Sequence, residues 1–225
     1  MVSWRDSKLV DASLPWWSRW YTLVLAWLSV TVLSQLCVSF AHHYYKPFYM
    51  PAESMAPTLE KNEKFVGDMR GGRHPSIGDL ILFDMPRGQY IKRVAALAGD
   101  RIAMRAGVPV INGRLAVQRN VGPTTFITSE GLVTAQRLLE KMPGQAGTHL
   151  ILDTGWSPID DMPELTVPPG HVFVLGDNRD RSADSRSRRS INGVERLSLQ
   201  AIRGRPLFIH WSGDRGRIGE RLALT

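Results

Sequence analysis

Ser54 and Lys92 are the residues of this sequence best suited to chemistry. Ser54 lies in PAESMAPTL (residues 51–59), a polar segment bracketed by prolines, and Lys92 lies in YIKRVAALAGD (residues 90–100). An alternating strand would put Lys92 on one face with Tyr90 and Val94. If that face is buried, the pKa of the lysine falls, and its neutral amine can take the proton of a serine hydroxyl. The alternatives are a loop serine and an edge-strand lysine whose amine reaches water.

A third polar segment, GDNRDRSADSR (residues 176–186), is too polar for a core strand and too patterned for a spacer. Its charged and amide side chains can form a charge-assisted hydrogen-bond network that holds a turn rigid. Ser182 could then orient a buried amine. Alone, this segment would equally suit a solvated loop or a nucleic-acid-binding patch. The side chains available for the network are Asp177, Asn178, Arg179, Asp180, Asp184 and Arg186.

These segments follow an apolar run, residues 21–41, that contains no charged residue. At 1.5 Å per residue, a helix of this length spans the roughly 30 Å hydrocarbon core of a bilayer. Its aromatic flanks are typical of interfacial belts. A cleavable signal peptide is the alternative, but the run exceeds the usual apolar core of about 7–15 residues. We therefore predict a short cytoplasmic tail (1–20), a transmembrane helix (21–41) and an extracytoplasmic domain (42–225). The flanking basic residues slightly favour this orientation.

The outer domain should be mainly antiparallel β, because glycine and proline are scattered between short alternating segments. Asn112-Gly113 predicts a hairpin with a type I′ turn. Residues 132–142 form the best helical candidate outside the membrane run, and residues 106–168 look less regular than the rest. The predicted strands are Lys64–Met69, Asp79–Phe83, Tyr90–Ala96, Arg101–Arg105, Val108–Ile111, Arg114–Val117, His171–Leu175 and Pro206–Trp211.

Composition excludes several classes of site. The single cysteine, Cys37, lies in the apolar run, so no intramolecular disulfide can form, and the six histidines show no metal-ligand spacing. We expect no metal and no cofactor. The net charge is +7, and basic residues gather near the third polar segment, residues 176–186, which we call the late polar segment. Anionic lipid headgroups are the expected partner, and nucleic acid is not expected. The basic cluster comprises Arg181, Arg186, Arg188, Arg189 and Arg196.

Taken together, the three polar segments resemble the type I signal peptidase (leader peptidase) family of membrane-anchored Ser/Lys endopeptidases. Residues 51–59 match its nucleophile segment, residues 90–100 its lysine segment, and residues 176–186 its late Gly-Asp-Asn-Arg-Asp segment. The resemblance runs from Phe48 to Ser212 in the family's order, behind an N-terminal span. The ordered set is far more specific than any one segment.

The resemblance implies a mainly β fold: an antiparallel β catalytic domain with one N-terminal transmembrane helix. It implies that Ser54 is the nucleophile, that Lys92 is the general base, and that Ser182 hydrogen-bonds the lysine. The supporting residues that it implies are Asp177, Arg179, Asp184 and Arg186. The substrate-site residues that it implies are Phe48, Met50, Ala52, Met55, Leu59, Tyr90 and Ile91, for which ordinary core packing is the alternative.

The activity implied is removal of N-terminal signal peptides from exported preproteins, after small residues in Ala-x-Ala sites, at the bacterial inner membrane. Ala52 departs from many bacterial members, in which a serine two positions before the nucleophile completes the oxyanion hole. This departure keeps open a specialised Ser/Lys peptidase that matures or cyclises a dedicated substrate such as a conjugative pilin. A catalytically inactive domain that only binds signal peptides is the other alternative, against which Ser54, Lys92 and Ser182 argue.

Overall fold

The computed structural model describes residues 20–71, 74–128, 131–187 and 193–222. The chain divides into two compact units, residues 1–43 and residues 44–225. The described residues of the first unit all belong to helix α1 (Trp20–Tyr44), which is long and apolar enough to cross a membrane, with a mean hydropathy of 2.0. The predicted helix, 21–41, lies within it. The predicted cytoplasmic tail falls outside the described residues, apart from Trp20.

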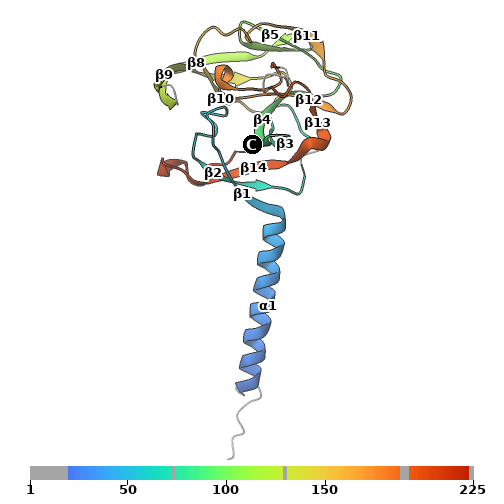
Figure 1. Cartoon of the computed structure of the whole chain (residues 1–225), viewed down its shortest axis with the longest axis vertical. Helices are drawn as coiled ribbons and strands as arrows, with labels where there is room; N and C mark the ends of the chain where they lie inside the picture. The colour runs from blue at the N-terminus through green and yellow to red at the C-terminus, as the bar shows by residue number, and fades with distance from the viewer. Residues whose placement is uncertain (1–19, 72–73, 129–130, 188–192, 223–225) are drawn as a thin grey trace, which may run out of the picture. The chain divides into compact units, whose positions relative to one another are not determined.

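The second unit contains a seven-stranded antiparallel sheet in the order β1-β2-β14-β3-β4-β12-β13. Figure 1 shows it in the lower half of this unit. Alternation of apolar residues and flanking turns predict most of these strands, and the structure confirms them with ends shifted by a few residues. The strands are β1 (Tyr45–Tyr49), β2 (Lys64–Asp68), β3 (Leu80–Met85), β4 (Gly88–Ala96), β12 (His171–Leu175), β13 (Leu197–Ser198) and β14 (Ile202–Trp211).

Two smaller antiparallel sheets contain β5 and the strands of residues 106–168, the region that the sequence predicts to be less regular. One has the order β10-β9-β8 and the other β11-β5-β6-β7. Residues 106–168 are therefore largely regular strand, which corrects that expectation. Asn112 and Gly113 both have positive φ, 51° and 76°, as the predicted I′ hairpin requires. The strands are β5 (Arg101–Arg105), β6 (Val108–Ile111), β7 (Arg114–Leu115), β8 (Val117–Thr128), β9 (Gly131–Lys141), β10 (His149–Asp153) and β11 (Met162–Thr166).

The predicted helix at residues 132–142 is wrong, because the segment forms strand β9. Three leucines and single alanine, glutamine, arginine, glutamate, lysine and methionine residues favour a helix there, but only weakly. Pairing with β8 along one edge and β10 along the other outweighs that preference. The buried side chains of β9, Ala135 and Glu140, contact residues distant in sequence, so the local pattern does not reveal them.

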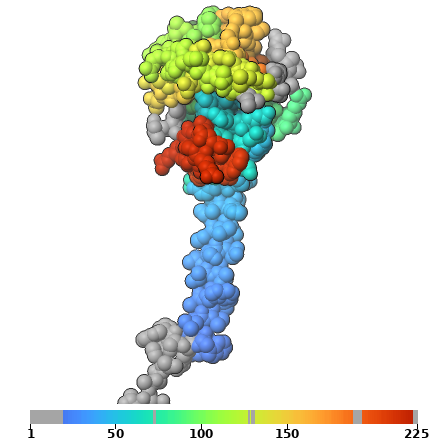
Figure 2. All heavy atoms as spheres, turned by 90° about the vertical axis from the view of Figure 1, so that its left-hand side faces the viewer, coloured from blue at the N-terminus to red at the C-terminus, as the bar shows by residue number. Residues whose placement is uncertain are grey.

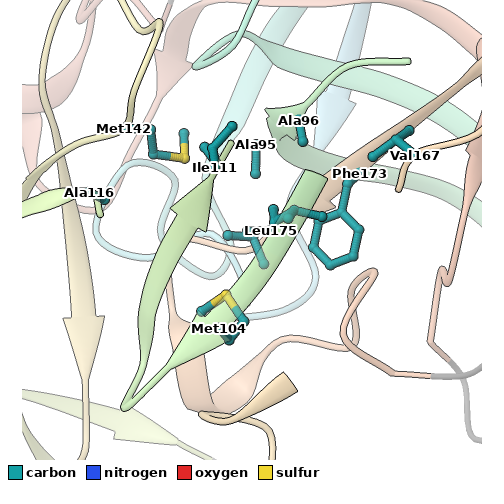
Figure 3. Close-up of a cluster of buried hydrophobic side chains, with 10 residues drawn as sticks. Ala95, Ala96, Met104, Ile111, Ala116, Met142, Val167, Phe173 and Leu175 are labelled. Atoms are coloured by element: carbon teal, nitrogen blue, oxygen red, sulfur yellow. The ribbon is translucent and has the colours of Figure 1, made fainter. Parts of the chain in front are cut away.

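A cluster of buried apolar side chains joins the seven-stranded sheet to the four-stranded sheet. Figure 3 shows Phe173 and Leu175 of β12 beside Met104 of β5 and Ile111 of β6. A second cluster lies under residues 51–59 and contains Met55 and Leu59, both fully buried. These two cores hold β4, β12 and the Ser54 segment in fixed relation, which is what a site shared between them requires.

Candidate active site

Ser54 and Lys92 are hydrogen-bonded to each other. Lys92 Nζ donates to Ser54 Oγ at 2.7 Å. Lys92 lies in the middle of β4, between β3 and β12, and is only 2% exposed, whereas Ser54 is half-buried. Burial lowers the pKa of the Lys92 amine to about 8, although the charges of Asp184 and Asp177 oppose the shift. Of the two possibilities that the sequence left open, a buried lysine and an edge-strand lysine that reaches water, the structure has the buried one.

The backbone of the Ser54 segment forms a tight turn that the late polar segment holds in place. Within the turn, Ala56 N donates to Glu53 O at 3.0 Å, and the Ala56–Pro57 peptide bond is cis. Asn178 Nδ2 donates to Glu53 O at 3.1 Å, and Asn178 N donates to Ser54 O at 3.2 Å. Asn178 thus holds the carbonyls of the two peptide bonds that flank Ser54, Glu53–Ser54 and Ser54–Met55.

Asp184 and Arg186 form a fully buried ion pair of 2.9 Å beneath the site. Burial opposes ionisation of Asp184, but Arg186 outweighs it and holds the pKa of the carboxyl below its usual value. Asp184 also accepts the backbone N–H of Gly176 at 2.9 Å. The pair predicted from the sequence is present, and it anchors the strand end that faces Ser54.

Asp177 and Arg179 each have a partner that the sequence did not indicate. Arg93 donates to both carboxylate oxygens of Asp177, at 2.8 and 2.6 Å, and Thr58 Oγ1 donates to Asp177 at 2.5 Å. Arg179 instead pairs with Glu140 of β9, where both side chains are buried. The one available signal was Arg93 itself, since an arginine inside an apolar strand needs a buried acid as its partner.

Ser182 lies next to the site without the hydrogen bond expected of it. Its Oγ is buried, and among the described residues it has no hydrogen-bond partner. It lies close to Gly176, where an added Cβ would come within 2.1 Å of Ser182 Oγ and 2.6 Å of Ser54 O. Only glycine allows these three residues to pack this closely.

A cavity of about 810 Å³ opens beside Ser54 and Lys92. Five of the seven substrate-site residues implied by the resemblance line it: Phe48, Met50, Ala52, Tyr90 and Ile91. The other two, Met55 and Leu59, do not line the cavity. Both are fully buried in the apolar cluster beneath the Ser54 turn, where they support the turn. A larger cavity of about 920 Å³ is lined by Glu53, Thr58 and other residues, but the potential chemistry lies in the smaller one.

Comparison with known proteins assigns the family. The sequence pattern of the family described as "Signal peptidase, peptidase S26" matches residues 20–211. Signal peptidase I of Pseudomonas aeruginosa is 31% identical over 63% of this chain and 54% of its own length. Signal peptidase I of Bacillus amyloliquefaciens is 26% identical over 83% of this chain and 87% of its own length. The probable signal peptidase I-1 of Synechocystis is 31% identical, over 77% of this chain and 76% of its own length. The chain belongs to the signal peptidase family, peptidase S26.

Proposed function

We propose that this protein is a type I signal peptidase that removes signal peptides from exported preproteins through a Ser54/Lys92 dyad. The observation that carries the proposal is the 2.7 Å hydrogen bond between a half-buried serine and a buried lysine in the wall of an apolar cavity. Family membership supports the same reaction, hydrolysis of a peptide bond by a serine peptidase.

In this mechanism, Lys92 acts in its neutral form. Its Nζ takes the proton of Ser54 as Oγ attacks the scissile carbonyl, and the protonated amine then gives that proton to the departing amine. Water attacks the resulting ester with Lys92 again as the base, which releases the signal peptide and restores Ser54. A pKa of about 8 leaves part of the lysine neutral near neutral pH.

Substrate selection follows from the cavity beside the dyad. Phe48, Met50, Tyr90 and Ile91 line it and leave apolar space next to Ser54. Narrow apolar subsites would admit alanine, glycine or serine one and three residues before the cut and reject larger side chains sterically. We therefore propose cleavage at Ala-x-Ala sites.

Stabilisation of the oxyanion depends on a donor other than the side chain at position 52, since Ala52 has none. The backbone N–H of Ser54 is one donor for the tetrahedral intermediate. Loss of one such donor elsewhere costs about 10²–10³ in rate. We propose that a group other than residue 52 supplies the second donor once substrate is bound. Without such a donor, this enzyme would be slower than a relative with serine at the position of Ala52.

We propose a single-pass anchor in the bacterial inner membrane, with a cytoplasmic N-terminus and the catalytic domain outside. Helix α1 and membrane-anchored family members support the anchor. Among the basic residues expected to meet anionic lipid, Arg186 is buried against Asp184 and cannot do so. Arg188 and Arg189 lie outside the described residues. Among the described residues of this cluster, Arg196 is exposed and Arg181 is partly exposed, so both remain candidates.

The test is cleavage of a preprotein with an Ala-x-Ala site by the full chain in liposomes. The wild type should cut after the second alanine, as N-terminal sequencing of the product would show, and Ser54→Ala should not cut. Replacement of that alanine by phenylalanine should stop cleavage. A peptidase devoted to one dedicated substrate, which Ala52 keeps as the second candidate, would leave generic secretory precursors intact. Cleavage elsewhere in the chain would contradict the proposed specificity.

A further inference from the structure

The last described residues of the chain, 212–222, fold back along β14 and reach the turn that carries Ser54. We call this segment the C-terminal clasp. Ile209 N donates to Glu220 O at 3.0 Å, and Leu222 N donates to Leu207 O at 2.8 Å. The match to the family ends at residue 211, so the clasp lies beyond it. In Figure 2 the C-terminal residues, in red, face the viewer and lie against the cyan residues that follow the Ser54 turn.

The clasp inserts one apolar and one charged side chain into this region. Leu222 is 5% exposed and belongs to the same apolar cluster as Met55 and Leu59 of the Ser54 turn. Arg217 ends a short 3-10 helix (Arg215–Arg217), and its Nη2 donates to Thr58 O at 3.0 Å. The clasp therefore contacts the turn through both packing and a hydrogen bond.

Glu63 holds the guanidinium of Arg217 in this position. Arg217 Nε donates to Glu63 Oε1 at 2.7 Å, and Nη2 donates to Glu63 Oε2 at 3.2 Å. Glu63 is 2% exposed and also accepts the backbone N–H of Glu60 at 2.7 Å. Burial opposes the charge of Arg217, but the Glu63 hydrogen bond outweighs it and raises the pKa of the guanidinium. Planar bidentate contact of this kind fixes orientation as well as charge.

The Ser54 turn is thus held at both ends by side chains from elsewhere in the sequence. Asn178 binds the carbonyls of Glu53 and Ser54, and Arg217 binds the carbonyl of Thr58. We propose that Arg217 is a positioning residue that keeps Ser54 within hydrogen-bond distance of Lys92. This inference rests on the proposed function, because it assigns a role only if Ser54 is the nucleophile.

The effect of losing Arg217 should fall on kcat. Phe48 and Met50 of the cavity precede the turn, and Tyr90 and Ile91 lie on β4, so substrate binding keeps its main apolar contacts. A shift of Ser54 relative to Lys92 slows proton transfer and attack, and misplacement by about 1 Å can cost on the order of 100-fold in rate. We expect kcat of Arg217→Ala to fall at least about tenfold, with KM within about twofold of the wild type.

The experiment compares Arg217→Ala with Arg215→Ala in the full chain, with a signal-peptide substrate and with added guanidinium ion. Arg215 is exposed in the same 3-10 helix and is the matched control. Guanidinium should restore part of kcat in Arg217→Ala and leave Arg215→Ala unchanged. General destabilisation by the substitution would not be rescued in this way, and circular dichroism checks that each variant is folded.

The proposal is overturned if folded Arg217→Ala keeps the kcat of Arg215→Ala, or if its loss appears in KM and guanidinium restores nothing. If Arg217→Ala does not fold, Arg217→Lys replaces it. Lysine keeps a charge beside Glu63 but lacks the fork that reaches Glu63 and Thr58 together. A reduced kcat supports the proposal, and an unchanged kcat overturns it. Cleavage that persists in Ser54→Ala would instead refute the proposed function, so the two failures are distinct.

Discussion

At Lys92, burial and neighbouring charge act on the pKa in opposite directions. Burial lowers it to about 8, while Asp184 and Asp177 favour the protonated form. Because the neutral amine is the base, activity requires loss of the proton, and the neutral fraction grows as the pH rises through this pKa. We expect kcat/KM to rise about tenfold per pH unit on the acid side and to level off above about 8. The pH profile of kcat/KM measures this, and a flat profile over the same range would contradict it.

The sequence predicts the surroundings of some site residues and not of others. The position of Lys92 in an apolar strand predicts its burial, and the order of the three segments predicts that it meets Ser54. The sequence does not predict the ion-pair partners of Asp177 and Arg179. These partners, Arg93 and Glu140 respectively, lie in strands far away along the chain. The hydrogen bond expected between Ser182 and Lys92 is not formed in this structure, where the buried Ser182 hydroxyl has no partner among the described residues.

At the scale of elements, β9 is tied to the late polar segment through a buried charge. Glu140 is fully buried and binds Arg179, and His149 of β10 lies 3.3 Å from the same carboxylate. Arg179 outweighs the burial of Glu140 and holds the pKa of the carboxyl well below its usual value. Glu140→Gln leaves the Arg179 charge without its partner, so we expect a loss of about 3–5 kcal/mol in the free energy of unfolding.

Urea unfolding measures that loss, with Glu164→Gln as the matched control. Glu164 pairs with Arg101 at 3.4 Å, but both side chains are about half exposed. Its replacement should change the free energy of unfolding by no more than about 0.5 kcal/mol. Equal effects of the two substitutions would show that the buried pair does not hold the sheets together.

The sequence predicts the bounds of the strands best where apolar and polar residues alternate strongly. Strands β5, β6 and β12 have the predicted bounds, and the Asn112-Gly113 turn has the predicted positive φ values. The sequence does not predict strand β9, because most of its residues weakly favour a helix and its pairing with β8 and β10 makes it a strand. Strand β1 is short and begins directly after the helix, so no turn signal separates the two in the sequence.

At the scale of the whole molecule, residues 44–225 form a compact unit with its own apolar cores. A protein that begins at Tyr44 should therefore fold and cleave a soluble peptide at a rate within about twofold of the full chain. Its kcat/KM for a preprotein inserted in liposomes should fall about 100-fold, since a shared membrane raises effective concentration by 10²–10⁴. Equal activity of both proteins on the inserted substrate would argue against a role for the helix in bringing enzyme and substrate together.

The central claim is that Lys92 is the base for Ser54, and cleavage by Lys92→Ala tests it most directly. The substrate is a preprotein with an Ala-x-Ala site, and the full chain in liposomes is the enzyme. The substitution removes the amine that donates a hydrogen bond to Ser54 Oγ. The account predicts that Lys92→Ala is as inactive as Ser54→Ala while both remain folded. Full activity of Lys92→Ala would contradict it.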